Sequence, residues 1–186
     1  DPNDFPDADA QPQRFDLADG EPHRDSFCNS QLHALLDGES DGEPDAFVRA
    51  RALGYTGVSS KACKGFYKSL LNRARCAQWN GGAAGPYFMS AEDLTTQAGL
   101  SVQQDLALVA LLGLTHVERN AHHFIAGFDG RPAHEADAFL AAHPDLYHLH
   151  RGRPHLHIRQ GRLQIASLAC AGFGCATTPD LGHAEP

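Results

Sequence analysis

The apolar residues of the chain recur every three to four positions in several segments, which is the spacing of one face of an α-helix. This pattern predicts a long helix over residues 61–78, with Ser59 or Ser60 as its capping residue, and an apolar helix over residues 102–112. Shorter helices are expected at 28–36, 46–53 and 133–142. Clusters of glycine, proline and aspartate separate these segments and predict the loops between them.

The spacing within residues 61–78 also predicts which face of that helix is buried. The expected buried stripe consists of Cys63, Phe66, Tyr67, Leu70, Leu71 and Ala74. The basic residues of the opposite edge are Lys61, Lys64, Lys68 and Arg75. A helix divided in this way packs its apolar stripe against the core and leaves its basic edge in solvent.

Residues 145–165 change to a period of two, which predicts β-strands. Four histidines take part in this alternation. His148 and His150 fall on one face of the first predicted strand, and His155 and His157 fall on one face of the next. The apolar residues of the other face are Leu149, Leu156 and Ile158.

The order of these segments predicts an α+β fold. A helical subdomain at about residues 45–130 precedes a C-terminal antiparallel sheet, a β-meander at about residues 145–168, on which the helix that begins at Cys28 packs. The chain has 186 residues, enough for one hydrophobic core, so residues 26–186 are expected to form a single domain.

Part of the helical region resembles a helix-turn-helix. Residues 90–101 have the form of a capped turn leading into the helix at 102–112, and residues 60–128 would then form a winged-helix-like module. The second helix carries no charge except Asp105, which argues against DNA binding because phosphate contacts need lysine or arginine. A non-catalytic module that binds a protein partner is therefore one alternative function.

Charge is distributed unevenly along the chain. Residues 1–45 hold 13 of the 23 acidic residues, whereas residues 46–91 hold none and contain seven lysines or arginines. We expect residues 1–25 to form an acidic, poorly ordered arm that solubilises the protein or lies over the basic segment. No stretch approaches the length of a membrane span, so a soluble protein, cytoplasmic or secreted, is expected.

Five cysteines are too few and too irregularly spaced for a disulfide scaffold or a four-thiolate zinc site. Cys170 and Cys175 enclose four residues and are open to two interpretations, a small-loop disulfide or two buried thiols. Cys28 lies in the first turn of a predicted helix, where free N–H groups favour the thiolate. It is either a nucleophile or a small buried hydrophobic residue.

Three segments together resemble the layout of papain-like cysteine hydrolases of the NlpC and CHAP kind. These are the helix that opens at Cys28, the strand that begins Asp145-Leu-Tyr, and the strand His155-Leu-His-Ile-Arg-Gln-Gly161. The resemblance implies acyl transfer through a thioester, with Cys28 as nucleophile and His155 as general base. It implies no cofactor. The substrates that it implies are peptides or proteins, with the cleaved bond in cell-wall peptide or in a host protein. Gln164, or less directly Ser167, would orient the imidazole.

The same histidines also resemble the three-histidine motif of mobilisation relaxases and other HUH nucleases. That resemblance makes His148, His155 and His157 ligands of a divalent metal ion that polarises a phosphodiester. The tyrosine nucleophile would be Tyr55, Tyr67 or Tyr87. The net charge of −8 argues against nucleic acid as a partner.

A simpler interpretation of the histidines remains open. Nine of the twelve lie between residues 116 and 157, a density that also fits a pH-responsive or solvated surface.

Overall fold

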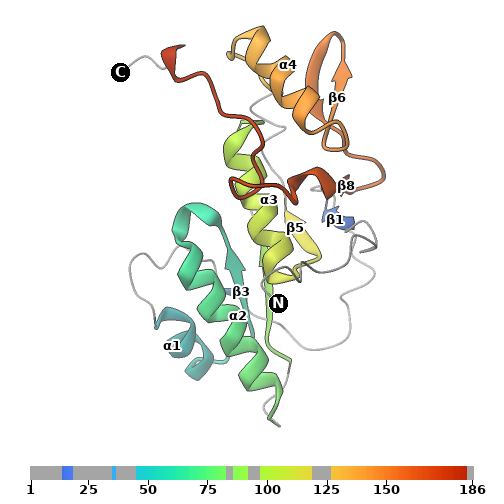
Figure 1. Cartoon of the computed structure of the whole chain (residues 1–186). Helices are drawn as coiled ribbons and strands as arrows, with labels where there is room; N and C mark the ends of the chain where they lie inside the picture. Colours follow the sequence, from blue (N-terminus) through green and yellow to red (C-terminus); the bar gives the residue numbers. More distant parts are fainter. Residues whose placement is uncertain are drawn as a thin grey trace, which may run out of the picture.

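A computed structural model describes residues 14–18, 35–36, 45–82, 86–91, 97–118 and 127–183, and these form a mixed α+β fold (Figure 1). Its helices are α1 (Ala46–Ala52), η1 (Ala62–Lys64), α2 (Phe66–Asn80), α3 (Leu100–Leu112), α4 (Ala133–Ala142), η3 (Ala166–Leu168) and η4 (Leu181–His183), where η marks a 3₁₀ turn. Its strands are β1 (Arg14–Ala18), β2 (Leu35–Leu36), β3 (Gly57–Ser60), β4 (Phe88–Ala91), β5 (His116–Glu118), β6 (Tyr147–His150), β7 (Arg153–Leu156) and β8 (Arg162–Gln164).

The larger of two sheets is mainly parallel. Its strand order is β2-β3-β4-β5-β1-β8, and every neighbouring pair is parallel except β1 and β8. A parallel pair needs a crossover connection, and α2 supplies it between β3 and β4, as α3 does between β4 and β5. The strands of this sheet have two to five residues, too few for a long alternating sequence pattern.

One face of this sheet is apolar and covered by helices. Val58 of β3 packs with Phe47 of α1 and Cys76 of α2, while Met89 of β4 touches this cluster and the main core. Side chains alternate along a strand, so the remaining inward positions lie on the same face. Among them are Ala91, Val117 and Leu163, all buried in the main core, and the buried Ser60, which is in register with Ala91.

Helix α3 is the centre of the main core. It is apolar on most sides, and its buried residues are Val102, Gln103, Leu106, Leu108, Val109 and Leu112. A helix that is hydrophobic nearly all round must be enclosed by other elements. In Figure 1 it lies between the α1–α2 layer and the part of the chain that contains α4. Gly113 ends it with a left-handed φ of 65°.

The second sheet is the antiparallel hairpin of β6 and β7, which packs on α4. Tyr147 anchors this hairpin to the core, because its ring is buried against Phe128 and its hydroxyl oxygen accepts a hydrogen bond from the Gly99 N–H at 3.0 Å. The two sheets therefore share one core cluster, which includes Val117 from one sheet and Leu156 from the other.

Most of the predicted helices are confirmed. Those expected at 46–53, 102–112 and 133–142 match α1, α3 and α4 within two residues at each end. The helix expected at 61–78 consists of η1 followed by α2. The helix expected at 28–36 lies outside the described residues except for its last two, Leu35 and Leu36, which form strand β2 instead.

The predicted helix-turn-helix is wrong. Ser90, expected to cap a helix, lies in β4, and this strand separates α2 from α3. Residues 45–130 therefore contain three strands of the sheet, β3, β4 and β5, besides α1, α2 and α3. Likewise, β1 lies within the segment expected to be an acidic arm, where it pairs with β5 and β8.

The expected β-meander is only partly formed. β6 and β7 pair as predicted, but β8 leaves the hairpin and pairs with β1 in the larger sheet. Leu163 explains this choice physically, since pairing with β1 buries its side chain completely in the main core.

The predicted buried stripe of α2 is only partly right, because Phe66 and Leu70 pack against the main core but other members do not. Tyr67 is 84% exposed and Leu71 is 42% exposed, whereas the buried residues of the helix are Ser69, Asn72 and Cys76. The helix is rotated because Ser69 meets the end of β3, where its hydroxyl lies 2.8 Å from that of Ser60. Within the described residues, no helix combines the length and the apolar character required to cross a membrane.

Candidate functional site

The face of the larger sheet that lies opposite the helices carries polar side chains. The register pairs Ser59 with Ser90, and the pairing of Ala91 with Val117 places Ser90 beside His116. His116 and Arg162 both pair with residue 16 of β1 from its two sides. Residues in register on neighbouring strands point to the same side. Ser59, Ser90, His116 and Arg162 therefore form one row across the sheet.

Two further ionisable residues extend this row toward the carboxyl ends of the parallel strands. Lys61 directly follows β3, and Glu118 is the last residue of β5. The register places Lys61 and Glu118 at the same height along their strands. Because β3 and β5 are two strands apart, the two backbones are about 10 Å apart. Gln164 of β8 lies on the same face but two residues away from the row, toward the amino ends of the parallel strands, where it is in register with residue 14 of β1. We call Lys61, His116, Glu118, Arg162 and Gln164 the polar face.

The loop that carries Lys61 is held in place on both sides. The Ala62 N–H donates to a carboxylate oxygen of Asp105 on α3 at 3.1 Å, and the Ser60–Ser69 contact ties the end of β3 to α2. Gly65 then turns the chain into α2 with a φ of 109°, a value that side-chain-bearing residues rarely adopt. The position of Lys61 at the edge of the sheet is thus fixed by its neighbours.

A glycine keeps part of this face open to an aromatic ring. A Cβ atom on Gly57 of β3 would lie 2.5 Å from the Phe88 ring of β4, closer than any real contact. Only glycine at position 57 lets the Phe88 ring lie over β3. This apolar platform adjoins the two buried serines of the row, Ser59 and Ser90.

The four histidines of the hairpin gather as the alternation predicts. His148 lies directly opposite His155, and the ring centroids are 4.6 Å apart for His148 and His157. The centroids are 5.5 Å apart for His150 and His155, and 6.3 Å apart for His148 and His150. This confirms that the four rings share one side of the hairpin, which we call the histidine face.

The opposite side of the hairpin is the side that packs on the core. Leu156 is buried there, as predicted, whereas Leu149 is 59% exposed near the hairpin turn.

The environment lowers the pKa of the two imidazoles of the second strand. Burial is the main cause that lowers the pKa of His155 and of His157, and nearby cationic groups add to it. Arg159 donates to Nε2 of His157 at 2.6 Å. Nδ1 of His148 is buried and has no hydrogen-bond partner among the described residues.

His155 is positioned by a glycine on the neighbouring turn. Gly127 has a φ of 59°, and a Cβ atom at that position would lie 2.5 Å from the carbonyl oxygen of Pro154 and 3.2 Å from Nδ1 of His155. The backbone of residue 127 thus packs closely against the strand that carries the imidazole.

The residues of the predicted catalytic set are not brought together by the described part of the chain. Cys28 lies outside the described residues. His155 is on the hairpin, whereas Gln164 is on β8 of the other sheet. Ser167, the alternative to Gln164, has its hydroxyl 3.0 Å from Nδ1 of His143 instead.

The predicted metal ligands do share a surface, although not as a ready-made metal site. Across the described ranges, no set of three or more histidine, cysteine, aspartate or glutamate side chains is arranged to hold a metal ion. Of the proposed tyrosine nucleophiles, Tyr87 accepts a hydrogen bond from Nε of Arg51 at 3.1 Å and Tyr67 lies on α2. Figure 1 shows α2 well separated from the hairpin.

The cysteines in the described segments are free thiols. Cys170 and Cys175 are half-buried, so the interpretation as two thiols is the one the structure favours over a disulfide. Burial raises the pKa of Cys76 to about 11, which makes this thiol unreactive at neutral pH.

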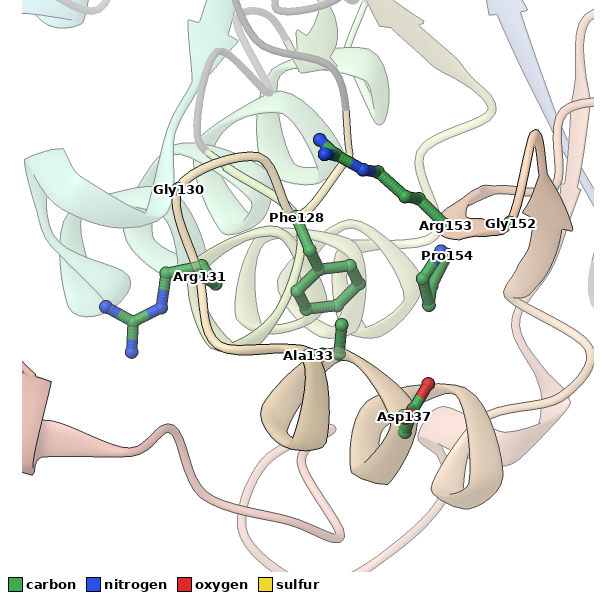
Figure 2. A pocket seen from close by; sticks show the side chains of 9 residues that line it. Phe128, Gly130, Arg131, Ala133, Asp137, Gly152, Arg153 and Pro154 are labelled. Atoms are coloured by element: carbon green, nitrogen blue, oxygen red, sulfur yellow. The ribbon is translucent and has the colours of Figure 1, made fainter.

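A cavity of about 220 Å³ lies between α4, the preceding turn and the end of the hairpin (Figure 2). Phe128, Ala133 and Pro154 form its apolar wall, and the Arg131 guanidinium points away from it. Both arginines of its rim are paired within the protein: Arg131 donates to both carboxylate oxygens of Glu135, and Arg153 to Asp129. These charged groups of the rim are therefore held by contacts within the protein.

Sequence reasoning missed the polar face, because its members come from short strands far apart in the chain. His116-Val-Glu118 is the one local signal, since it alternates polar and buried residues. Comparison of the chain with family models, with characterised proteins and with solved structures gave no match.

Proposed function

We propose that this protein binds a small organic anion on the polar face and carries out acid–base chemistry on it. The observation that carries the proposal is the strand register, which lines up four ionisable side chains on the sheet face opposite α1, α2 and α3. They are Lys61, His116, Glu118 and Arg162. In open α/β sheets, ligands bind beyond the carboxyl ends of the parallel strands, where Lys61 and Glu118 lie.

The chemistry of these side chains suggests their roles. Arg162 and Lys61 are cations suited to a carboxylate or phosphate group of the ligand. His116 and Glu118 follow each other at alternate positions of β5, about 7 Å apart along the strand. An imidazole and a carboxylate at that spacing can accept and return a proton on a molecule that the cations hold.

The dimensions of the row also favour a small ligand. His116 and Arg162 are two strands apart, or about 10 Å, which is the length of a small metabolite rather than of a polymer. The hydrophobic contacts that the described helices make with this sheet lie on its opposite side, so a ligand on the polar face does not meet them.

The test is a thermal-shift and calorimetric screen of the full chain against small carboxylates and phosphate esters. We expect at least one compound to bind, and Arg162→Gln and Lys61→Met to weaken it at least ten-fold. Arg151→Gln, on the exposed hairpin turn, removes the same charge away from the polar face and serves as the control. The proposal is wrong if no compound binds, or if the control weakens binding as much as Arg162→Gln does.

A cysteine hydrolase built on Cys28 and His155 is a second proposal. It is supported by the half-buried position of His155, which Gly127 fixes on the hairpin. We expect iodoacetamide to modify Cys28 faster than the exposed Cys63, and His155→Gln to remove the difference. Equal rates for the two thiols, or no effect of His155→Gln, would refute a Cys28–His155 pair.

A further inference from the structure

The histidine face has the arrangement of two His-x-His pairs on adjacent antiparallel strands. His148 and His150 belong to β6. His155 belongs to β7, and His157 directly follows the end of that strand. The closest contacts run across the hairpin, from His148 to His157 at 4.6 Å and from His150 to His155 at 5.5 Å between ring centroids. Two cross-strand imidazole pairs thus lie next to each other.

These separations are short enough for imidazoles to share a metal ion once their side chains rotate, although no three donors of the described residues are now arranged around one. With metal–nitrogen bonds of about 2.0–2.1 Å and tetrahedral angles, the centroids of two ligating rings are roughly 5 Å apart. The two cross-strand distances lie on either side of this value. Neutral imidazole is the ligand that Ni²⁺, Cu²⁺ and Zn²⁺ favour among side chains without sulfur.

A buried nitrogen supplies an independent indication. Nδ1 of His148 is enclosed by the protein and, in the described part of the structure, has no hydrogen-bond partner. A buried polar atom without a partner costs free energy, and a bound cation at the face would coordinate that atom or its reoriented ring.

We propose that the histidine face binds one divalent cation of the late first transition series, with His148 and His157 as one pair of ligands and His150 and His155 as the other. The rings now face one another rather than a common point, so binding requires rotation of the side chains. His150 is exposed and free to rotate, and the other three rings are half-buried. His157 must also release the hydrogen bond from Arg159.

The charges around the face moderate the affinity. Arg159 lies beside His157, and Arg153 is ion-paired with Asp129 next to the hairpin. An arginine near the ligands opposes a second positive charge. Replacement of Arg159 by glutamine is therefore expected to tighten metal binding several-fold, whereas removal of a ligand weakens it.

The experiment is calorimetric titration of the full chain with NiCl₂ in a buffer that does not bind metals. One equivalent is expected to bind, and His148→Gln and His155→Gln are each expected to weaken binding at least ten-fold. His134→Gln is the matched control. His134 is an exposed histidine of α4, and it is paired with Asp180 of the C-terminal segment rather than with the hairpin. Paramagnetic broadening by Ni²⁺ should affect the imidazole proton signals of the four hairpin histidines first.

Two results would overturn the proposal. The first is an affinity weaker than millimolar in the unmodified chain. The second is binding that His148→Gln and His155→Gln leave unchanged, which places the ion elsewhere. The circular dichroism spectrum of each variant shows whether it is still folded. A folded variant that binds Ni²⁺ more weakly has lost a ligand rather than its fold. The outcome is independent of the polar face, because His148 and His155 belong to the other sheet.

Discussion

At the scale of single residues, the structure depends on a few buried polar groups that are fully paired. His143 is completely buried, and its Nε2 accepts a hydrogen bond from the Ala176 N–H at 3.3 Å. The ring proton is therefore on Nδ1, which donates to the Ser167 hydroxyl oxygen at 3.0 Å. The neutral ring links the end of α4 to the C-terminal segment.

This environment predicts a pH dependence of stability. Burial lowers the pKa of His143 below its ordinary 6.5, although Asp145 and the hydrogen bond with Ser167 oppose the change. The unfolded chain therefore binds a proton at this residue near pH 6.5 that the folded chain does not bind. The contribution of His143 to stability is constant above that pH and falls below it. Urea titrations from pH 7.5 to 5.5 should show a smaller fall for His143→Gln than for the original protein. Parallel curves would contradict this account.

Glu135 is the second such residue. It is 5% exposed, accepts two hydrogen bonds from Arg131 at 2.9 and 2.6 Å, and accepts one from the Asp180 N–H at 2.8 Å. Burial raises the pKa of its carboxyl, but these hydrogen bonds outweigh burial and the pKa is lowered. Its stabilising effect is therefore present above the ordinary pKa of 4.5 and is lost as the pH falls below it.

We expect Glu135→Gln to lower the free energy of unfolding at pH 7 by about 1.5–3 kcal/mol, because charge-assisted hydrogen bonds are lost. Asp137→Asn, on the exposed side of the same helix, should change it by less than about 0.5 kcal/mol. Chemical denaturation of both variants measures the difference. Equal values for the two would mean that the contacts of Glu135 do not stabilise the fold.

At the scale of elements, α3 joins the two halves of the protein. Its residues contact the helix-covered face of the larger sheet, and its start is held by the hydroxyl of Tyr147 from the hairpin. Gly99, whose N–H donates that hydrogen bond, directly precedes Leu100, the first residue of α3. Packing of α3 thus decides how the two sheets are placed.

Two leucines of α3 test this role. Leu106 is fully buried and Leu111 is 56% exposed on the same helix. We expect Leu106→Ala to cost about 2–5 kcal/mol of stability, because it leaves a cavity, and Leu111→Ala to cost less than about 1 kcal/mol. Urea unfolding followed by circular dichroism compares them. A similar loss for both would show that α3 is not enclosed as described.

At the scale of the whole molecule, two sheets share one core. The main cluster extends from Ala91 of the larger sheet to Tyr147 and Leu156 of the hairpin, and Met89 connects it to the cluster around Phe47. Elements that share a continuous core unfold together. The hairpin is therefore part of the cooperative unit rather than an independent module.

We expect one unfolding transition for the whole protein. Trp79 is the only tryptophan and packs between Phe47 and Tyr87, so its fluorescence reports on the α1–α2 layer. The imidazole signals of His148 and His155 report on the hairpin. Both probes should give the same urea midpoint. Two distinct midpoints would show that the hairpin opens separately.

The sequence by itself determined those features whose signal is local. The spacing of apolar residues located α1, α3 and α4, and the alternation after Asp145 placed four histidines on one side of a hairpin. Such patterns are readable because the period of a helix or strand depends only on neighbouring residues.

Only the tertiary structure decided which strands pair and which helix faces are buried. β1 pairs with β8 at Arg14 and Gln164, so the polar face joins residues that no local period connects. In α2, contact with Ser60 turned Ser69 inward and left Tyr67 in solvent. The physical reason is the same in both cases. Contacts with distant partners, apolar burial for Leu163 of β8 and a buried hydroxyl pair for Ser69 of α2, outweigh the preference that a segment shows alone.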